Sequence, residues 1–457
     1  MLGLLATACS FNAPTSMTPQ QEFNEIFAAA GMPVPKRLQG VREPPALWQR
    51  SREVTWNSSK QFFDWYYIYV RDVEEKRAWA FTYAMSRCGK DAAGRTDGCK
   101  YGGAWPGFVT MEPGEAAVSY VEQHELAAWR ASGATQSATI LSRTGSTNMT
   151  ISAPHSDGSV VHLSGTLGTR AAAWRDEGGL GASPISWDLK VARRAGWFGE
   201  SWVEQPFHLG EKMGAIMWSP YGHMGTVVGS ITVRGRTFKL GGDEGRYRAY
   251  CDSNWGTHMP RPPPGGEAID YPWGWYYAAR PSADLKADVS IICGAGRTSY
   301  WLTGSVYGKL CDLRVGAGFR LSLWSWTFDR LGKTASWASD SDELQGVESF
   351  EITRGGWVNW TDGYGEARVP MAQQLSIVTR KHQISLNFSA TRNATSRLVF
   401  PSEDTLFSDF EALGAIAAVE VRERKLEGGG AGRVVASFVD DMAGLEFGYR
   451  VGEEPPK

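Results

Sequence analysis

The chain has 457 residues, a length that accommodates two large β domains as well as roughly three smaller ones. Its formal net charge of -2 argues against nucleic acid as a partner, because nucleic-acid recognition requires a basic face. The chain holds 20 Trp, 16 Tyr and 19 Phe, side chains that suit sheet faces and apolar pockets, so we expect a turn-rich, all-β globular protein.

The N-terminal segment combines an apolar stretch and one helix. The opening run MLGLLATACSF is apolar but has no basic residues before it, so we expect at most the remnant of a signal peptide. Residues 17–32 predict a short helix, because Thr18 can cap it, Pro19 suits its first turn and Gly31 ends it. We assign residues 1–39 to this segment.

From about residue 54 onward the sequence pattern is typical of strands. Alternating apolar residues predict strands at 159–167, 382–392, 417–424 and 434–442. Residues 227–240 predict two strands joined by a tight turn, and the Gly-rich stretch 425–433 predicts a hairpin connection. In the 382–392 strand, Asn387 should point outward. Residues 114–133 fit either a helix or strands.

The domain organisation follows from breaks in this pattern. The Pro- and Gly-rich residues 259–272 form an excursion between strands, whereas 281–288 make a better domain border. We therefore predict one β domain over 40–282 and a second over 283–457. No apolar run reaches about 18 residues, so we expect no membrane span, and no repeat indicates a solenoid or propeller.

Two features favour the secretory pathway. Five of the eight asparagines begin an Asn-X-Ser/Thr acceptor sequence, where chance predicts about one, so we predict N-linked glycans at Asn57, Asn148, Asn359, Asn387 and Asn393. The pairs Cys88/Cys99 and Cys293/Cys311 each frame a short Gly-rich loop that a disulfide can close, which leaves Cys251 over. Reduced, buried thiols are the alternative. We expect a secreted protein or one in the lumen of the pathway.

Most catalytic motifs are absent from the sequence. It has no zinc-ligand spacing, no phosphate-binding glycine loop and no nucleophile elbow, so we expect no metal, no cofactor and no hydrolase. A glycosidase would need paired carboxylates. The clustered acids Asp340, Asp342 and Glu343 are better explained as a solvated loop.

The run RAYCDSNWG, residues 248–256, carries the strongest chemical signal. An inward-facing Asp252 between Tyr250 and Trp255 would be partly desolvated. Desolvation raises the pKa of a carboxyl, which suits it to act as an acid toward an alkene or a quinone oxygen. The alternative is that Asp252 and Asn254 hydrogen-bond a backbone turn and contact no ligand.

Three segments resemble the carotenoid hydratase/tocopherol cyclase-like family: 183–193 (SPISWDLKVAR), 217–256 and 271–278 (YPWGWYYA). The Asp-X-Asn-Trp-Gly run and the Trp273/Trp275 pair are the most recognisable marks. The resemblance covers roughly residues 155–280 and implies two lipocalin-like (calycin) β-barrel or sandwich domains in tandem. The family includes alkene hydratases, chromanol-forming cyclases and fungal lipocalin-like Diels–Alder and hetero-Diels–Alder catalysts, which act on apolar polyenes or prenylated rings.

The resemblance implies a cofactor-free pericyclase of secondary metabolism. It would join a terpenoid or polyene to a reactive quinone-methide-like partner by a Diels–Alder or hetero-Diels–Alder cycloaddition, with both π systems held in an aromatic-lined pocket. Asp252, Asn254 and His223 are the candidate catalytic groups. The candidate substrate-binding residues are Trp187, Trp202, Tyr221, Trp255, Trp273, Trp275, Tyr276, Trp324 and Trp326.

The support for these residues differs. The resemblance carries Asp252, Asn254, Trp255 and the Trp273/Trp275 pair, and the others rest on the strand pattern. Two alternative functions stay open. One is acid-catalysed hydration or cyclisation of a prenyl double bond by Asp252, and the other is non-catalytic binding of a lipid or terpenoid.

Overall fold

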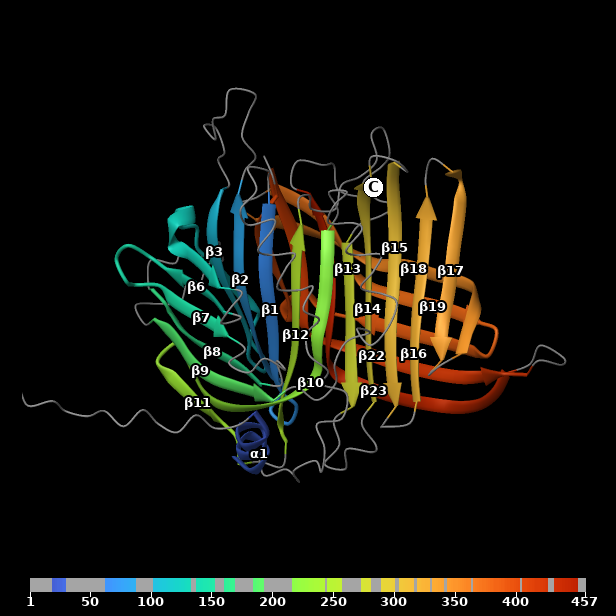
Figure 1. Cartoon of the computed structure of the whole chain (residues 1–457), viewed down its shortest axis with the longest axis horizontal. Helices are drawn as coiled ribbons and strands as arrows, with labels where there is room; N and C mark the ends of the chain where they lie inside the picture. Colours follow the sequence, from blue (N-terminus) through green and yellow to red (C-terminus); the bar gives the residue numbers. More distant parts are fainter. Residues whose placement is uncertain are drawn as a thin grey trace, which may run out of the picture.

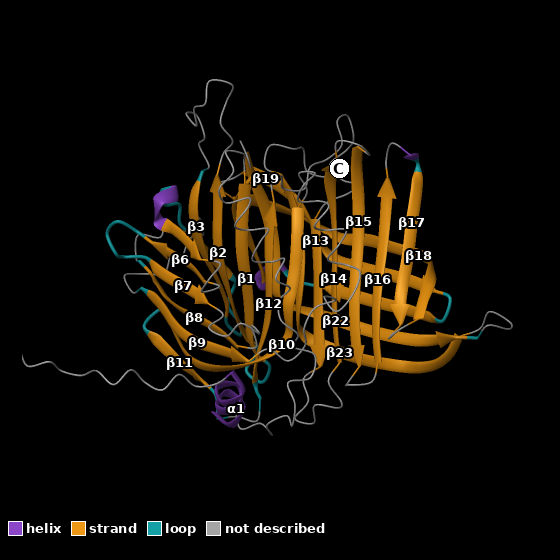
Figure 2. Ribbon diagram, viewed as in Figure 1, coloured by secondary structure: helices purple, strands orange, loops and turns teal. Residues whose placement is uncertain are grey.

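The computed structural model describes residues 19–29, 62–87, 102–132, 137–152, 160–168, 184–192, 216–242, 245–256, 273–280, 289–300, 304–315, 319–328, 331–340, 343–362, 365–402, 405–425 and 431–450. Strands dominate these ranges, with one α-helix, α1 (Pro19–Ala29), at the N-terminal end (Figure 2). Two short 3₁₀ helices cover Leu126–Ala128 and Arg392–Ala394. The predicted all-β class and the short N-terminal helix are both confirmed.

The strands form two antiparallel sheets, one from each half of the chain (Figure 1). The first sheet contains β1 (Phe62–Asp72), β2 (Arg77–Arg87), β3 (Gly103–Met111), β4 (Val118–Val121), β5 (Trp129–Ser132), β6 (Ser137–Leu141), β7 (Asn148–Ser152), β8 (Val160–Leu167), β9 (Ile185–Ala192), β10 (Ile216–Val233), β11 (Arg236–Leu240) and β12 (Tyr247–Gly256). The second contains β13 (Trp273–Arg280), β14 (Val289–Tyr300), β15 (Gly304–Val315), β16 (Phe319–Phe328), β17 (Lys333–Asp340), β18 (Glu343–Asp362), β19 (Gly365–Thr379), β20 (His382–Ser389), β21 (Thr395–Ser402), β22 (Thr405–Arg424) and β23 (Ala431–Arg450).

The two sheets differ in closure. The first runs β4-β3-β2-β1-β12-β10-β9-β8-β7-β6-β5, with β11 paired to β10. The second runs β20-β19-β18-β17-β16-β15-β14-β13-β23-β22-β21, and β20 also pairs with β22, which closes the strands into a ring. β13 precedes the predicted border at 281–288 but pairs with β14 and β23, so the chain changes sheet between Gly256 and Trp273.

Several local predictions are confirmed. Residues 227–240 form the β10–β11 hairpin, whose turn residues Arg234 and Gly235 have φ angles of 51° and 74°. β20 buries its alternate apolar residues and leaves Asn387 exposed, as the alternation predicts. The ambiguous stretch 114–133 is resolved as β4, a 3₁₀ turn and β5.

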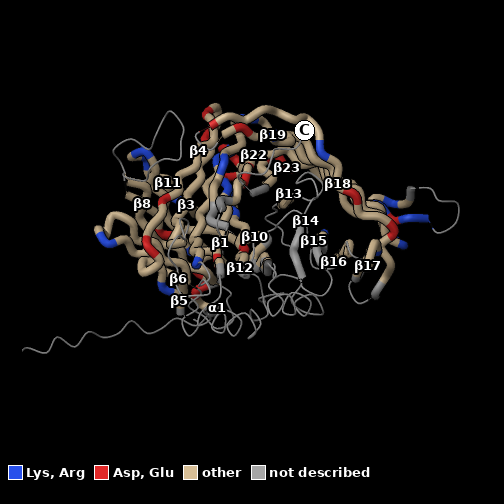
Figure 3. The backbone as a smooth tube through the Cα atoms, turned by 90° about the horizontal axis from the view of Figure 1, so that it is seen from above, with Lys and Arg blue, Asp and Glu red and all other residues tan. Residues whose placement is uncertain are grey.

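The alternation of side chains along β13 shows how the two sheets meet. The closed ring of the second sheet is called the second barrel. Tyr276 and Ala278 point into this barrel and join its core. Trp275 and Tyr277 point the other way and join the core of the first sheet, because successive residues of a strand face opposite sides. The Tyr250 ring of β12 lies 5.0 Å from the rings of both Trp275 and Tyr277. The outer face of the second barrel therefore packs on β1, β10 and β12 of the first sheet. Its strands β21 and β22 also contact β2, β3 and β4 (Figure 3).

A buried ion pair also connects the two sheets. The Arg71 guanidinium of β1 donates to the Asp440 carboxylate of β23 at 2.7 Å, to the Met442 carbonyl at 2.9 Å and to the Ala279 carbonyl at 2.9 Å. The Tyr69 hydroxyl lies 2.7 Å from the same Met442 carbonyl. These contacts fix the position of β1 against β13 and β23, which are the strands that build the site described next.

Candidate active site at the junction of the two sheets

Asp252 lies in the middle of β12, on the face that meets the second barrel. Tyr250, Asp252 and Asn254 alternate with residues of the opposite face, and all three are buried. Asp252 is paired with Tyr67 of β1 and with Pro220 of β10. This position is inside a strand, so the expected backbone turn is wrong. Contact of Asp252 and Asn254 with a ligand stays a prediction.

The carboxyl of Asp252 is held from one side only. Its Oδ2 accepts hydrogen bonds from the Trp218 indole at 2.8 Å and from the Tyr250 hydroxyl at 2.7 Å. Its Oδ1 is buried and has no hydrogen-bond partner among the described residues. Burial raises the pKa of Asp252 to about 7, although both hydrogen bonds oppose the shift. Because both donors reach Oδ2, a proton on this carboxyl would lie on Oδ1, the oxygen without a described partner.

Three further carboxyl groups face this junction from β22 and β23. Glu411 and Glu446 are directly paired across the two strands, and Asp409 is paired with Gly448. Burial raises the pKa of both Asp409 and Glu446, and the charge of Asp252 adds to both shifts. These two residues lie close enough for their titrations to interact, and the charge of Asp409 raises the pKa of Glu446 further.

Glu411 lacks any compensation among the described residues. Its side chain is 1% exposed, and neither carboxyl oxygen accepts a hydrogen bond from a described residue. Burial raises its pKa to about 8. We call Asp252, Asp409, Glu411 and Glu446 together the acid cluster. Burial raises the pKa of each of these four carboxyl groups.

Aromatic rings surround the acid cluster. Trp218 of β10 lies edge-on to Trp273 of β13, with ring centroids 6.2 Å apart, and Trp275 lies 5.7 Å from Tyr67. The indole of Trp218 reaches across the junction to Gly294 of β14, where a Cβ atom would lie 2.6 Å from the ring. Aromatic contacts of this kind contribute about 0.5–1.5 kcal/mol each beyond area burial.

The structure brings together only part of the predicted site. Asp252, Asn254, Trp273 and Trp275 share the junction, and Trp324 and Trp326 belong to the same apolar cluster on the outer face of the second barrel. Trp187 instead donates to the Tyr83 hydroxyl and stacks on Phe108 inside the first sheet. Tyr276 points into the second barrel and donates to Gln373 at 2.8 Å.

The remaining predicted site residues are not described. Trp202 lies outside the described ranges. His223 and Tyr221 lie in β10 and Trp255 in β12, and their side chains are outside the description.

The cysteine prediction is confirmed for one pair. Cys293 and Cys311 are directly opposed on β14 and β15 and form a disulfide. Cys251 is buried and lies outside this disulfide, as predicted. Cys88 and Cys99 lie outside the described ranges.

Four predicted glycan acceptors can be placed. Asn148, Asn359, Asn387 and Asn393 are exposed, whereas Asn57 lies outside the described ranges. Glycosylation itself stays a prediction. Within the described ranges, no helix is both long and apolar enough to span a membrane.

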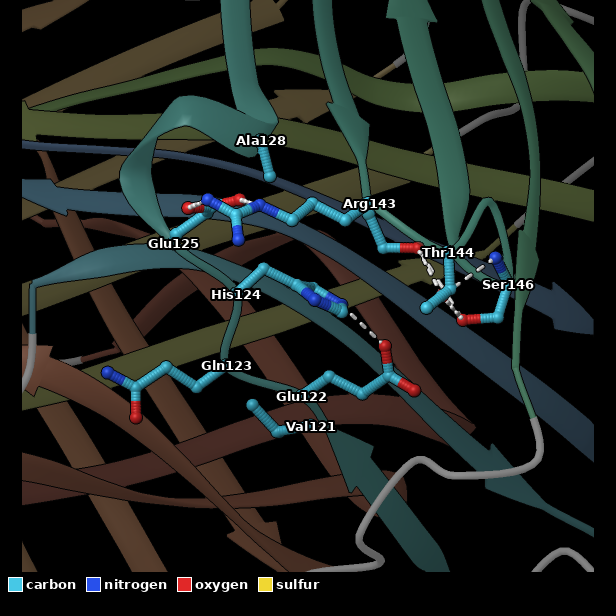
Figure 4. A pocket seen from close by; sticks show the side chains of 10 residues that line it. Val121, Glu122, Gln123, His124, Glu125, Ala128, Arg143, Thr144 and Ser146 are labelled. Carbon is cyan, nitrogen blue, oxygen red and sulfur yellow. Dashed lines mark hydrogen bonds and ion pairs between the residues drawn. The ribbon is translucent and has the colours of Figure 1, made fainter.

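A separate groove of about 570 Å³, lined by several charged side chains, opens beside β4 and the β6–β7 turn (Figure 4). Glu122 lines it and accepts hydrogen bonds from His124 at 2.7 Å and Thr147 at 2.6 Å. Arg143 pairs with Glu125 across the groove. These charges already have partners, and the groove has no aromatic wall, so the junction is the better candidate for an apolar substrate.

Comparisons with known proteins find similarity to solved structures at low identity. No protein-family model and no curated protein matches it. CghA solved with Sch210972 is similar at a TM-score of 0.46 and 10% identity, covering 87% of this chain and 90% of CghA. Kievitone hydratase from Nectria haematococca is similar at a TM-score of 0.43 and 12% identity, covering 85% and 88%. What this chain does must be inferred from the chemistry of the junction.

Proposed function

We propose that this protein is an enzyme that converts an apolar, unsaturated small molecule at the junction of the two sheets, with Asp252 as the hydrogen-bond or proton donor. One observation carries the proposal. Two donors fix Oδ2 of Asp252 and leave Oδ1 without a described partner, among aromatic rings. A buried carboxyl with this geometry and a raised pKa presents an acidic hydrogen to a substrate oxygen or double bond.

The leading reaction is the Diels–Alder or hetero-Diels–Alder cycloaddition of a terpenoid or polyene with a quinone-methide-like partner. Three π bonds are replaced by two σ bonds and one new π bond, and no atom is gained or lost. Asp252 would donate a hydrogen bond to the carbonyl oxygen of the electron-poor partner and polarise it. Trp273 and Trp275 would hold the two π systems in contact, so orientation supplies much of the rate gain.

Acid-catalysed hydration or cyclisation of a prenyl double bond is the second candidate, and the acid cluster favours it. Asp252 would give its proton to one alkene carbon, and water or an internal hydroxyl would attack the other. The attacking oxygen then loses a proton, which returns the acid to its starting state. The neighbouring Asp409 and Glu446, whose pKa values burial raises, could take up and return this proton.

Product mass separates the candidates. Purified protein would be incubated with apolar polyenes and quinone-methide-like partners, and products followed by mass spectrometry and chiral chromatography. A product whose mass equals the sum of two reactants, with one configuration in excess, supports intermolecular cycloaddition. An isomeric product indicates an intramolecular cyclisation, and a gain of one water indicates hydration. Retention of unchanged ligand without any product would contradict the enzyme proposal and indicate a binding protein.

We also propose that the protein works in the secretory pathway or outside the cell and carries N-linked glycans. The Cys293–Cys311 disulfide supports this location, because disulfides persist in oxidising compartments. The exposure of Asn148, Asn359, Asn387 and Asn393 supports glycan attachment, which requires an accessible amide. The partners proposed are therefore apolar small molecules and glycans.

A further inference from the structure

Exposed apolar side chains lie beside two of the predicted glycan acceptors. Large hydrophobic residues are exposed at only a few described positions, among them Leu141 at 43%, Ile416 at 50% and Val439 at 66%. Contiguous exposed apolar surface on a soluble protein usually marks a contact surface or an aggregation hazard. The sheet register shows which residues lie beside these exposed side chains.

The first patch lies on the outward face of β20, β22 and β23. Asn387 is paired with Ala418, and Ala418 is paired with Val439 on the next strand. Ser389, which completes the Asn387-Phe388-Ser389 acceptor sequence, is paired with Ile416. All of these side chains except that of Phe388 are exposed. Directly paired residues have Cβ atoms about 4.5–5.5 Å apart, so the first sugar on Asn387 would lie against Ala418.

The second patch repeats this arrangement on the first sheet. Asn148 of β7 is paired with Leu141 of β6, and both side chains are exposed. In contrast, Asn359 of β18 is paired with Arg368. The three acceptors are all strand residues, but only Asn387 and Asn148 have an apolar residue as a direct or second neighbour on the paired strands.

We propose that N-linked glycans on Asn387 and Asn148 cover the adjacent apolar surface, and that the Asn387 glycan keeps the Ile416–Ala418–Val439 patch from self-association. A glycan is bulky and solubilising, and the C–H face of its first sugars can lie on aliphatic side chains. The Asn387 amide nitrogen donates to the Ser385 hydroxyl at 3.4 Å. Glycosylation replaces one of its two N–H bonds and leaves the other for this contact. The proposal is independent of the reaction at the junction.

The first measurement is the occupancy of each acceptor in the full chain secreted from a eukaryotic host. Enzymatic deglycosylation in ¹⁸O water followed by peptide mass spectrometry marks each occupied asparagine as labelled aspartate. Occupancy at Asn387 and Asn148 is expected. An unmodified Asn387 in the secreted protein would overturn the proposal.

The second measurement asks what the glycan does. Asn387→Gln and, as a matched control, Asn359→Gln each remove one acceptor, and the folded wild type can be trimmed enzymatically if a variant fails to be secreted. Loss of the Asn387 glycan is expected to raise apolar-dye fluorescence and the self-associated fraction in light scattering at least about twofold. Asn359→Gln should leave both near wild-type values.

A compensating variant ties the effect to the patch. Ile416→Thr with Val439→Thr, added to Asn387→Gln, removes the apolar surface without restoring the glycan. Dye binding and self-association should return to wild-type values. An Asn387→Gln variant that behaves like Asn359→Gln, or a triple variant that stays self-associated, would show that the glycan has no shielding role at this surface.

Discussion

At the scale of single residues, the carboxyl of Asp252 carries the sharpest prediction. Asp252→Asn keeps the size of the side chain but removes the acidic hydrogen from Oδ1. If the reaction is acid-catalysed hydration or cyclisation, turnover should fall by about 10²–10⁴-fold, the usual contribution of a general acid. In the wild type the neutral form is active, so the rate should fall as pH rises through about 7, the pKa of this group. The variant should lose this part of the pH profile.

The control is Asp188→Asn on β9, an exposed aspartate of the same sheet. It should retain wild-type turnover and the same pH midpoint. The outcome differs if the junction only orients the substrate and Asp252 donates nothing to it. Asp252→Asn would then keep its rate, and only substitutions of Trp273 or Trp275 would change rate or product configuration.

At the scale of elements, the position of β22 against the first sheet buries the Glu411 carboxyl, which has a cost that depends on pH. The pKa of Glu411 is about 8 in the folded chain and about 4.3 in an unfolded one. The folded state therefore holds the proton more tightly. Its stabilising contribution is complete below about pH 4 and is lost as pH rises through about 8.

Glu411→Gln should remove this loss, because glutamine stays neutral at every pH. Thermal unfolding between pH 5 and pH 9 is expected to show a flatter profile and a higher midpoint than the wild type at pH 9. Glu420→Gln, on the same strand but at the surface beside Arg422, is the matched control and should follow the wild type. A Glu411→Gln profile as steep as the wild type would assign the pH dependence to other groups.

The sequence predicts elements better than it predicts the neighbours of each element. Alternation is local, so β20 and the β10–β11 hairpin follow directly from their own residues. The same alternation puts Tyr276 and Trp275 on opposite faces of β13. The predicted set of substrate-binding residues included both and did not use this signal. Glu411 and Glu446 were not predicted, because no local pattern reveals that two strands from the C-terminal region lie against β12.

The site itself shows the same division. Asp252 stands out in the sequence because aromatic residues flank it. Trp218, which holds its Oδ2, comes from another strand and could be recognised only from the β10–β12 register. The residues that surround Asp252 therefore follow from the packing of the two sheets. The sequence pattern of a single strand does not reveal them.

At the scale of the whole molecule, that packing depends on Arg71. Its side chain is 1% exposed and pairs with Asp440, which is itself buried and also accepts from the backbone amides of Ala279 and Met442. Arg71→Met leaves this carboxylate without its counter-charge in a desolvated position. Breaking a buried pair from one side costs about 3–5 kcal/mol, measured as the free energy of unfolding in urea.

The neighbouring pair between Lys76 and Asp441 provides the contrast, because it joins the β1–β2 turn to β23 and its side chains are 45% and 57% exposed. Lys76→Met should cost about 0–1 kcal/mol, since water already screens an exposed pair. Hydrogen exchange then locates the effect. In Arg71→Met, amides of β13 and β23 should exchange faster and the Asp252-dependent rate should fall with them, because the acid cluster exists only while the sheets are apposed. Faster exchange confined to β1, with the rate unchanged, would mean that the aromatic contacts alone hold the junction.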